Sequence, residues 1–227
     1  MAGINQIKPI KNRAPRKRSP RITVPEDIWL KDIIDEHLQE VIPKKTGGVF
    51  HPSSLGNTCD RYLWLYYNGK LPEEILEARV IRIFQNGNFL EERVDKWLSG
   101  LNILIEREIS LKQDIPPISG RMDFLIRHYQ YGELPVELKS INKKGFEALR
   151  RPKPEHTVQL QMYLNMGGYD KGTVLYECKD DQHIKTFLLD RDEELWDKLL
   201  KRMFAIQDML AMPEKCTGNL WCKCKAV

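Results

Sequence analysis

The sequence predicts an α/β protein of the α+β type, in which helices flank a central mixed β-sheet. Apolar residues follow helical spacing through most of the first third of the chain. Short segments rich in β-formers then alternate with two further helical segments. With 41% hydrophobic and 30% charged residues over 227 positions, the chain can bury one sizeable core. Strands followed by a helix and more strands therefore predict a sheet covered by helices.

The N-terminal residues are strongly basic. Several prolines and no apolar periodicity predict a disordered basic arm over residues 1–24, followed by a single domain over residues 25–227. The arm is either a solvated tail or localisation signal, or a phosphate-binding segment. Seven basic residues precede the first acidic residue: Lys8, Lys11, Arg13, Arg16, Lys17, Arg18 and Arg21.

The hydropathy pattern gives no indication of a membrane span or a signal peptide. No stretch approaches the roughly 18 apolar residues that a membrane span needs. No apolar run follows the early basic residues, as a signal peptide would require. We therefore expect a cytoplasmic protein without a membrane partner.

The predicted elements follow from local patterns. Apolar residues at helical spacing predict helices, the first beginning at Pro25, and Gly100 and Pro213 are expected to end two of them. The turn "QYGE" separates two of the strands, and Gly167-Gly168 ends the helix between the two groups of strands. In order, we expect helices over 24–42, 59–69 and 77–100, strands over 103–111, 120–129 and 134–142, a helix over 156–166, strands over 171–179 and 183–190, and a helix over 191–211.

The segment "PVELKS" carries a candidate site. In an extended strand Glu137 and Lys139 share one face, because successive side chains alternate. Pairing with the preceding strand can bring Asp123 next to them. Two carboxylates on adjacent strands suit Mg²⁺ or Mn²⁺, which can polarise a phosphodiester and activate water. The alternative is an exposed strand face with a weak ion pair, since a bare Glu-x-Lys is common by chance.

Four short motifs in order form a wider pattern. They are Gly87-x-x-x-Glu91, Gly120-x-x-Asp123, Glu137-x-Lys139 and Gln159-x-x-x-Tyr163. Over about residues 50 to 165 the chain resembles the PD-(D/E)XK nucleases, within them the RecB-like and lambda-type phage exonuclease branch.

The resemblance implies a restriction-endonuclease-like core and assigns roles to these residues. Asp123 and Glu137 would be the principal metal ligands, Lys139 the catalytic lysine, and Glu91 a further catalytic ligand from a helix. Gln159 and Tyr163 lie four apart on one helix face, with His156 one turn earlier. In the family this face contacts the substrate and supports the active site, whereas a lone histidine is otherwise a capping or surface residue.

The segment "HPSSLGNTCDRYLWLYY" resembles the N-terminal element of these enzymes. Arg61 could clamp a phosphate with two hydrogen bonds, and Ser53 is a second candidate substrate contact. Alternatively Ser53 or Ser54 caps a helix that begins near Leu55. The aromatic residues that follow either pack in the core or stack on unpaired bases.

Five cysteines suggest a second metal site. Disulfides are rare in the cytosol, so clustered thiols favour metal binding or free thiols. One upstream cysteine plus three near the C-terminus resembles the iron–sulfur nucleases of the same superfamily, including CRISPR-adaptation exonucleases and AddB-type helicase-nucleases, which implies a [4Fe–4S] cluster. The Cys-x-Cys pair is tighter than usual, so Zn²⁺ is the alternative. The ligands would be Cys59, Cys216, Cys222 and Cys224, with Cys178 a buried apolar residue.

These readings predict a Mg²⁺-dependent DNA exonuclease of phage recombination, repair or CRISPR spacer processing, in a bacterium or phage-infected host cell. A structure-selective endonuclease of the junction-resolvase kind is the first alternative. The second is a DNA-binding module that no longer cuts. The resemblance implies linear duplex or single-stranded DNA ends as the substrate. It also implies a single-strand annealing or recombination protein as partner and a homo-oligomer, in lambda-type enzymes a ring-shaped trimer.

Overall fold

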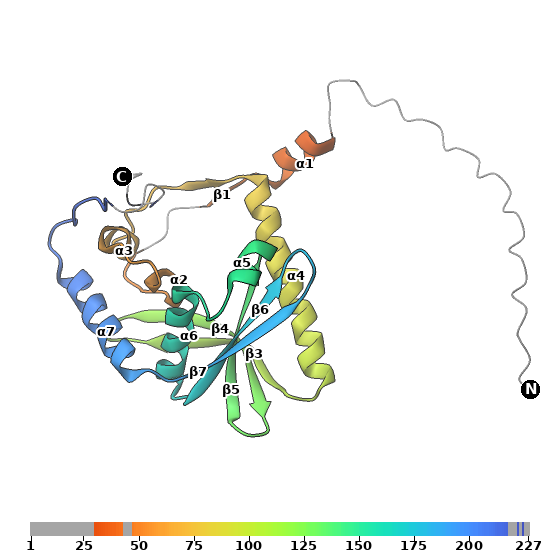
Figure 1. Cartoon of the computed structure of the whole chain (residues 1–227). Coiled ribbons are helices and arrows are strands. Elements are labelled where there is room, and N and C mark those ends of the chain that lie inside the picture. Colours follow the sequence, from red (N-terminus) through yellow and green to blue (C-terminus); the bar gives the residue numbers. More distant parts are fainter. Residues whose placement is uncertain (1–29, 43–46, 218–221, 223, 225–227) are drawn as a thin grey trace, which may run out of the picture.

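The computed structural model describes residues 30–42, 47–217, 222 and 224, and Figure 1 shows the arrangement of their helices and strands. The predicted basic arm over residues 1–24 and the predicted helix start at Pro25 lie outside the described residues. Within the described part of the chain, every helix is too short or too polar to cross a membrane.

A five-stranded mixed sheet forms the centre of the molecule, which confirms the predicted fold class. Its strand order is β3-β4-β5-β6-β7. The β5–β6 pair is parallel, and the other three pairs are antiparallel. The crossover from β5 to the parallel β6 runs through two helices, as parallel pairing requires. The strands are β3 (Leu104–Gln113), β4 (Ile118–His128), β5 (Gly132–Ile141), β6 (Lys171–Cys178) and β7 (Ile184–Asp190).

Helices cover both faces of the sheet (Figure 1). On one face lies the long helix α4, whose Leu90 and Val94 pack on Phe124 and Val136. On the other face α6 packs through Leu160 on the sheet, and α2, α3 and α7 share a further core next to it. The helices are α1 (Leu30–Leu38), α2 (Pro52–Leu55), α3 (Asp60–Tyr67), α4 (Ala78–Gly100), α5 (Lys143–Ala148), α6 (Pro154–Gly167) and α7 (Glu193–Asp208).

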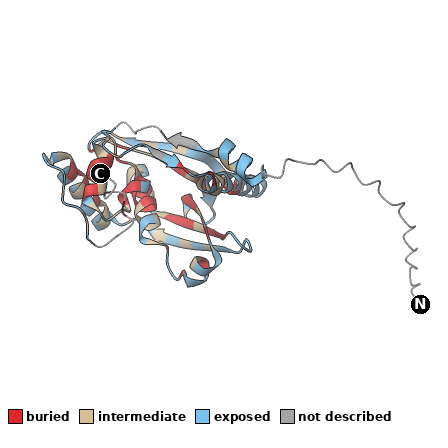
Figure 2. Ribbon diagram, turned by 90° about the horizontal axis from the view of Figure 1, so that it is seen from above, coloured by how far each residue is buried: buried red, intermediate tan, exposed pale blue. Residues whose placement is uncertain are grey.

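Buried residues concentrate where the helices meet the sheet (Figure 2). Phe50, Leu63 and Met203 are fully buried in the core between α2, α3 and α7. This packing holds the segments before and after the sheet against α6. The sheet is therefore fixed from both faces at the strands that carry the candidate active site.

Some local predictions were wrong. The first helix ends at Leu38, and residues 40–42 form strand β1 (Glu40–Ile42), which pairs with β2 (Glu74–Leu76). Val41 and Ile42 favour a strand, and a partner segment more than 30 residues away decides the outcome. Neither serine caps α2: the N-cap is His51, and Ser54 Oγ donates to the His51 carbonyl at 2.7 Å.

Candidate active site and thiol centre

The candidate active site lies where β4 and β5 diverge. Backbone pairing between the two strands runs from His128↔Gly132 to Phe124↔Val136 and then stops. One residue further, Asp123 Oδ2 accepts the backbone N–H of Leu138 at 2.7 Å. A carboxylate thus takes the place of a backbone carbonyl, which keeps Asp123 next to the Glu137–Lys139 segment although the ladder has ended.

Glycine at position 120 allows this divergence. A Cβ atom there would lie 2.7 Å from Pro52 Cγ and 2.8 Å from Tyr163 Cε1, closer than side-chain atoms normally approach. Tyr163 also donates its hydroxyl to the Arg121 carbonyl at 2.8 Å. The first half of β4 is therefore drawn toward α2 and α6, away from β5, just before Asp123.

Glu137 lies beneath the site, fully buried at 0% exposure. Lys139 forms an ion pair with its Oε1. Even so, neither carboxylate oxygen of Glu137 accepts a hydrogen bond of regular geometry from any residue that the structure describes. A buried carboxylate usually accepts several hydrogen bonds, so these oxygens have unused capacity for a cation.

A recess of about 500 Å³ opens above this carboxylate. Glu91 on α4, Asp123 on β4 and Lys139 on β5 line it together, whereas Glu137 lies behind its surface. Glu91 Oε1 is also buried without a hydrogen bond among the described residues, and its nearest cation is the Arg107 guanidinium at 3.8 Å. Three chain segments thus bring two carboxyl groups and one ammonium to a single recess, and the buried Glu137 carboxylate pairs with that ammonium.

The electrostatics of the carboxyl groups reflect this crowding. Burial, and then the negative charge of Asp123, raises the pKa of Glu137 to about 8, against the opposing effect of Lys139. Burial also raises the pKa of Asp123, and Lys139 and the Leu138 N–H only partly oppose it. The pKa of Glu91 is raised by burial and by Asp123. Each group is thus hard to ionise here unless more positive charge is present.

Lys139 supplies the main positive charge at Glu137 and Asp123, whereas Arg121 and Arg107 act on Glu91. Burial lowers the pKa of its ammonium, but Glu137 and Asp123 outweigh burial and raise it overall. Lys139 is therefore charged at neutral pH and balances one of the three carboxylates. One ammonium does not offset three carboxylates, which is why their pKa values are raised. A hard divalent cation with oxygen ligands would supply the missing positive charge and let these groups ionise.

The predicted substrate-binding residues on α6 are mostly buried. Gln159 is 8% exposed and Tyr163 is 2% exposed. Gln159 Nε2 donates to the Tyr163 hydroxyl at 3.4 Å, and that hydroxyl holds the Arg121 carbonyl. In this position the pair supports the strand that carries Asp123. This burial does not support a direct contact with the substrate.

His156 belongs to a hydrogen-bond chain that begins next to Lys139. Tyr176 is the Cα partner of Lys139 in the parallel ladder. Its hydroxyl accepts the Lys153 N–H at 3.0 Å and lies 2.6 Å from His156 Nδ1. Because burial and then Lys139 lower the pKa of His156 to about 4, the imidazole is neutral at neutral pH, and its Nδ1 shares a hydrogen bond with the Tyr176 hydroxyl. The sequence analysis missed Tyr176. Strand alternation could have indicated its burial, because it places Tyr176 on the same face of β6 as the apolar Val174.

Acid should destabilise the protein partly through His156. Its pKa is about 4 in the folded protein and 6.5 normally, so between these values the unfolded chain binds more protons. The free energy of unfolding should therefore fall as pH drops from about 6.5 to 4. In His156→Asn, which keeps an acceptor near the Nδ1 position, this part of the pH dependence should be absent. Urea unfolding across this range measures it, with exposed His37→Asn as control; equal slopes in parent and His156→Asn would contradict the assignment.

Arg61 occupies a different place from the one predicted. It is 7% exposed, its Nε donates to the Cys224 carbonyl at 3.1 Å, and its Nη1 donates to the Pro213 carbonyl at 2.7 Å. The guanidinium thus fastens the C-terminal segment to α3 instead of facing solvent. A phosphate contact is not supported by this position. Ser53 is exposed on α2, and its contact with the substrate stays a prediction.

Removing this guanidinium should loosen the C-terminal segment. We expect Arg61→Ala to lower the free energy of unfolding by about 2–4 kcal/mol, because charged hydrogen bonds are lost and buried carbonyls remain unpaired. Arg61→Lys should recover only part of this, since a lysine cannot donate along two directions in one plane. Chemical unfolding measures the loss. Arg150→Ala, an exposed arginine that also donates to a carbonyl, is the control; equal losses in the two variants would contradict the fastening role.

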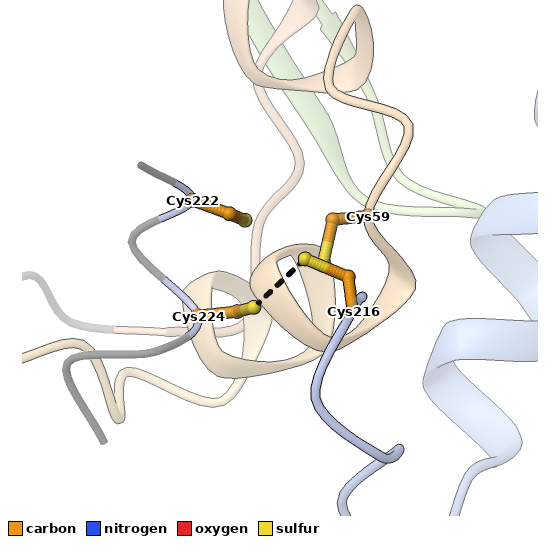
Figure 3. A group of neighbouring side chains, drawn as sticks. All are labelled: Cys59, Cys216, Cys222 and Cys224. Atoms are coloured by element: carbon orange, nitrogen blue, oxygen red, sulfur yellow. Dashed lines mark hydrogen bonds between the residues drawn. The ribbon is translucent and has the colours of Figure 1, made fainter. Parts of the chain in front are cut away.

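The four predicted cysteines converge in the structure (Figure 3). We call Cys59, Cys216, Cys222 and Cys224 the thiol cluster. Their sulfur atoms all lie within 4.8 Å of one another, and Cys216 Sγ lies 3.4 Å from Cys224 Sγ. Among the described residues this is the only group of three or more metal-ligand side chains that meets so closely.

The thiol cluster joins the start of α3 to the C-terminal segment. Cys59 is the N-cap of α3, where its sulfur accepts the Tyr62 N–H at 3.4 Å. Burial opposes ionisation of Cys224, but hydrogen bonds from the Cys216 backbone and the neighbouring thiols lower its pKa to about 7. A thiolate ready to bind a metal is therefore present near neutral pH. Four such ligands form a closed site of structural type.

Comparison with known proteins supports the fold. No family model matches the chain, and no curated protein matches it either. Among solved structures, the alkaline exonuclease LHK-Exo from Laribacter hongkongensis is 16% identical, with a TM-score of 0.54 over 71% of this chain and 87% of that one. The complex of LHK-Exo with dAMP gives 0.50 at 17% identity, over 70% and 86%. A protein designated SSO0001 gives 0.51 at 21% identity, over 78% and 84%. At these identities the likeness establishes a shared fold.

Proposed function

We propose that the protein is a Mg²⁺- or Mn²⁺-dependent deoxyribonuclease that acts as an exonuclease on linear DNA. The observation that carries this proposal is the buried carboxylate of Glu137, whose oxygens have the Lys139 ammonium as an ion-pair partner but accept no hydrogen bond of regular geometry from described residues, next to a recess lined by Asp123, Glu91 and Lys139. Structural glutamates are not normally left in this state. The fold shared with an alkaline exonuclease supports the same reading.

Each residue has a stated part in this proposal. Asp123 and Glu137 would hold the ion, with Glu91 as a further ligand from α4. When bound, such an ion polarises a phosphodiester and lowers the pKa of bound water. Lys139, paired with Glu137, holds its ammonium at the recess, where it can neutralise charge that develops on a phosphate. His156 and Tyr176 keep the neighbouring strand in place beside Lys139.

The proposal is tested with end-labelled linear DNA and covalently closed circular DNA in Mg²⁺. We expect the parent protein to degrade only the linear DNA, and Asp123→Asn to reduce the rate at least about 100-fold, as loss of a key charge at a phosphate site does. Glu133→Gln changes an exposed glutamate on the neighbouring strand β5 and should leave the rate unchanged. Cutting of closed circles would replace the proposal with a structure-selective endonuclease. Binding without cutting would replace it with an inactive DNA-binding module.

We further propose that the thiol cluster holds a structural metal that ties the C-terminal segment to α3. The mutual approach of four sulfurs supports this, and Arg61 fastens the same two segments. Sulfurs about 2.3 Å from one tetrahedral Zn²⁺ would lie about 3.8 Å apart, which suits the observed spacing. A [4Fe–4S] cluster would use the same four thiolates and is distinguished from zinc by its colour and iron content.

A further inference from the structure

Two adjoining recesses form one trough between α4 and the sheet. The first, of about 500 Å³, is the recess of the candidate active site. The second, of about 230 Å³, is also lined by α4 and extends to Glu177 and Gln182. They share Leu90, Ser140 and Lys179 as lining residues, so they adjoin. We call this combined hollow the α4 trough.

Two phenylalanine rings border the trough without being buried. Phe84 lines the first recess and is 54% exposed, and Phe89 lines the second and is 64% exposed. Neither belongs to the apolar core that α4 forms with the sheet. Each half of the trough therefore presents one accessible aromatic face beside polar groups.

One lysine that lines both recesses has a free ammonium. Lys179, directly after β6, is exposed and lines both recesses. Its ammonium makes no hydrogen bond or ion pair with any described residue. The other cations of the trough are engaged, since Lys139 pairs with Glu137 and Arg93 with Glu177. Lys179 can therefore bind an anion without breaking an existing contact.

From this arrangement we propose that the α4 trough binds an unpaired DNA strand, with Lys179 on a backbone phosphate and Phe84 and Phe89 stacked on bases. Bases in a duplex are stacked on each other, so only a single strand offers its faces to protein aromatics. The proposal rests on the proposed nuclease function and adds the substrate class, because the trough begins at the carboxylates that would act on the strand.

Binding of fluorescein-labelled single-stranded and duplex oligonucleotides, followed by anisotropy with Ca²⁺ in place of Mg²⁺, tests this proposal on the full-length chain. Phe89→Ala and Phe84→Ala should each raise the Kd for the single strand by at least about fivefold, the lower end of a stacking contact, with a smaller effect on the duplex. Phe89→Trp should retain binding and Phe89→Leu should not, because stacking needs an aromatic ring.

Lys179→Ala should make the negative slope of log K, the association constant, against log salt concentration shallower by about 0.7. This is the change expected when one phosphate contact on a single strand is lost. Matched controls lie on α7, on the opposite flank of the sheet from α4 (Figure 1): Phe204→Ala, 40% exposed, and Lys201→Ala, also exposed. Neither control should change the Kd or the slope.

The outcomes separate this inference from the proposed function. If the parent protein cuts DNA but the trough variants bind the single strand like the controls, the trough assignment fails while the nuclease remains. If the phenylalanine variants alter only the oligomeric state, measured by light scattering, the trough is a protein contact and the inference is also overturned. If the parent protein neither binds nor cuts DNA, the proposed function itself fails.

Discussion

Replacing Glu137 with glutamine is expected to abolish DNA cleavage and at the same time to stabilise the metal-free protein. Glutamine keeps the shape of the side chain but cannot carry the negative charge that burial disfavours at this position. Relief of that burial and of the repulsion with Asp123 should raise the free energy of unfolding by about 1–3 kcal/mol. Cleavage should fall by at least about 1,000-fold, because a neutral amide is a poor ligand for Mg²⁺.

Urea unfolding in the presence of a chelator and the DNA degradation assay measure the two effects. Addition of Mg²⁺ should stabilise the parent, since a ligand that binds only the folded state adds to its stability, and should leave Glu137→Gln unchanged. Glu133→Gln, on the same strand but exposed, should resemble the parent in both assays. A Glu137→Gln protein that is less stable than the parent without metal would identify Glu137 as an ordinary structural carboxylate.

The second large effect is expected at the thiol cluster. Cys222→Ala should release the bound metal and lower the free energy of unfolding by more than about 4 kcal/mol, because the binding energy of a structural metal contributes directly to folding. The loss should extend to the contacts that depend on the C-terminal segment, such as those of Arg61 with the Cys224 and Pro213 carbonyls.

Elemental analysis and thermal unfolding of anaerobically prepared protein check this prediction. Cys178→Ala is the matched control, since Cys178 is a buried thiol in another core and should cost about 1 kcal/mol without changing the metal content. A brown protein with iron would identify an iron–sulfur cluster, and a colourless protein with one zinc would identify a single ion. A parent protein without metal and as stable as Cys222→Ala would refute a structural metal.

The positions of the strands along the chain and the closeness of Asp123 to the Glu137–Lys139 segment could be predicted from the sequence, because alternation and hairpin pairing are local rules. The burial of Glu137 could not. It depends on the divergence of β4 from β5, which Gly120 permits by its contact with Pro52 and Tyr163. The residues around Glu137 in the sequence give no indication of the contact of Gly120 with Pro52 and Tyr163.

Long-range partners explain the remaining differences. Arg61 was assigned to phosphate because a guanidinium can clamp a phosphate with two hydrogen bonds, but its acceptors are carbonyls that lie more than 150 residues later in the chain. Lys179 and Phe89 are far apart in sequence and carry no motif, so only the sheet brings them to one trough. The thiol cluster was easier to predict, because metal ligands are few and chemically distinctive.

The most direct test of the whole account is anomalous X-ray diffraction from crystals grown with Mn²⁺. The account predicts a manganese peak between α4 and the β4–β5 divergence, with oxygen atoms of Asp123 and Glu137 as ligands. A peak that lies elsewhere, or the absence of a peak together with Asp123 and Glu137 pointing apart, would contradict it.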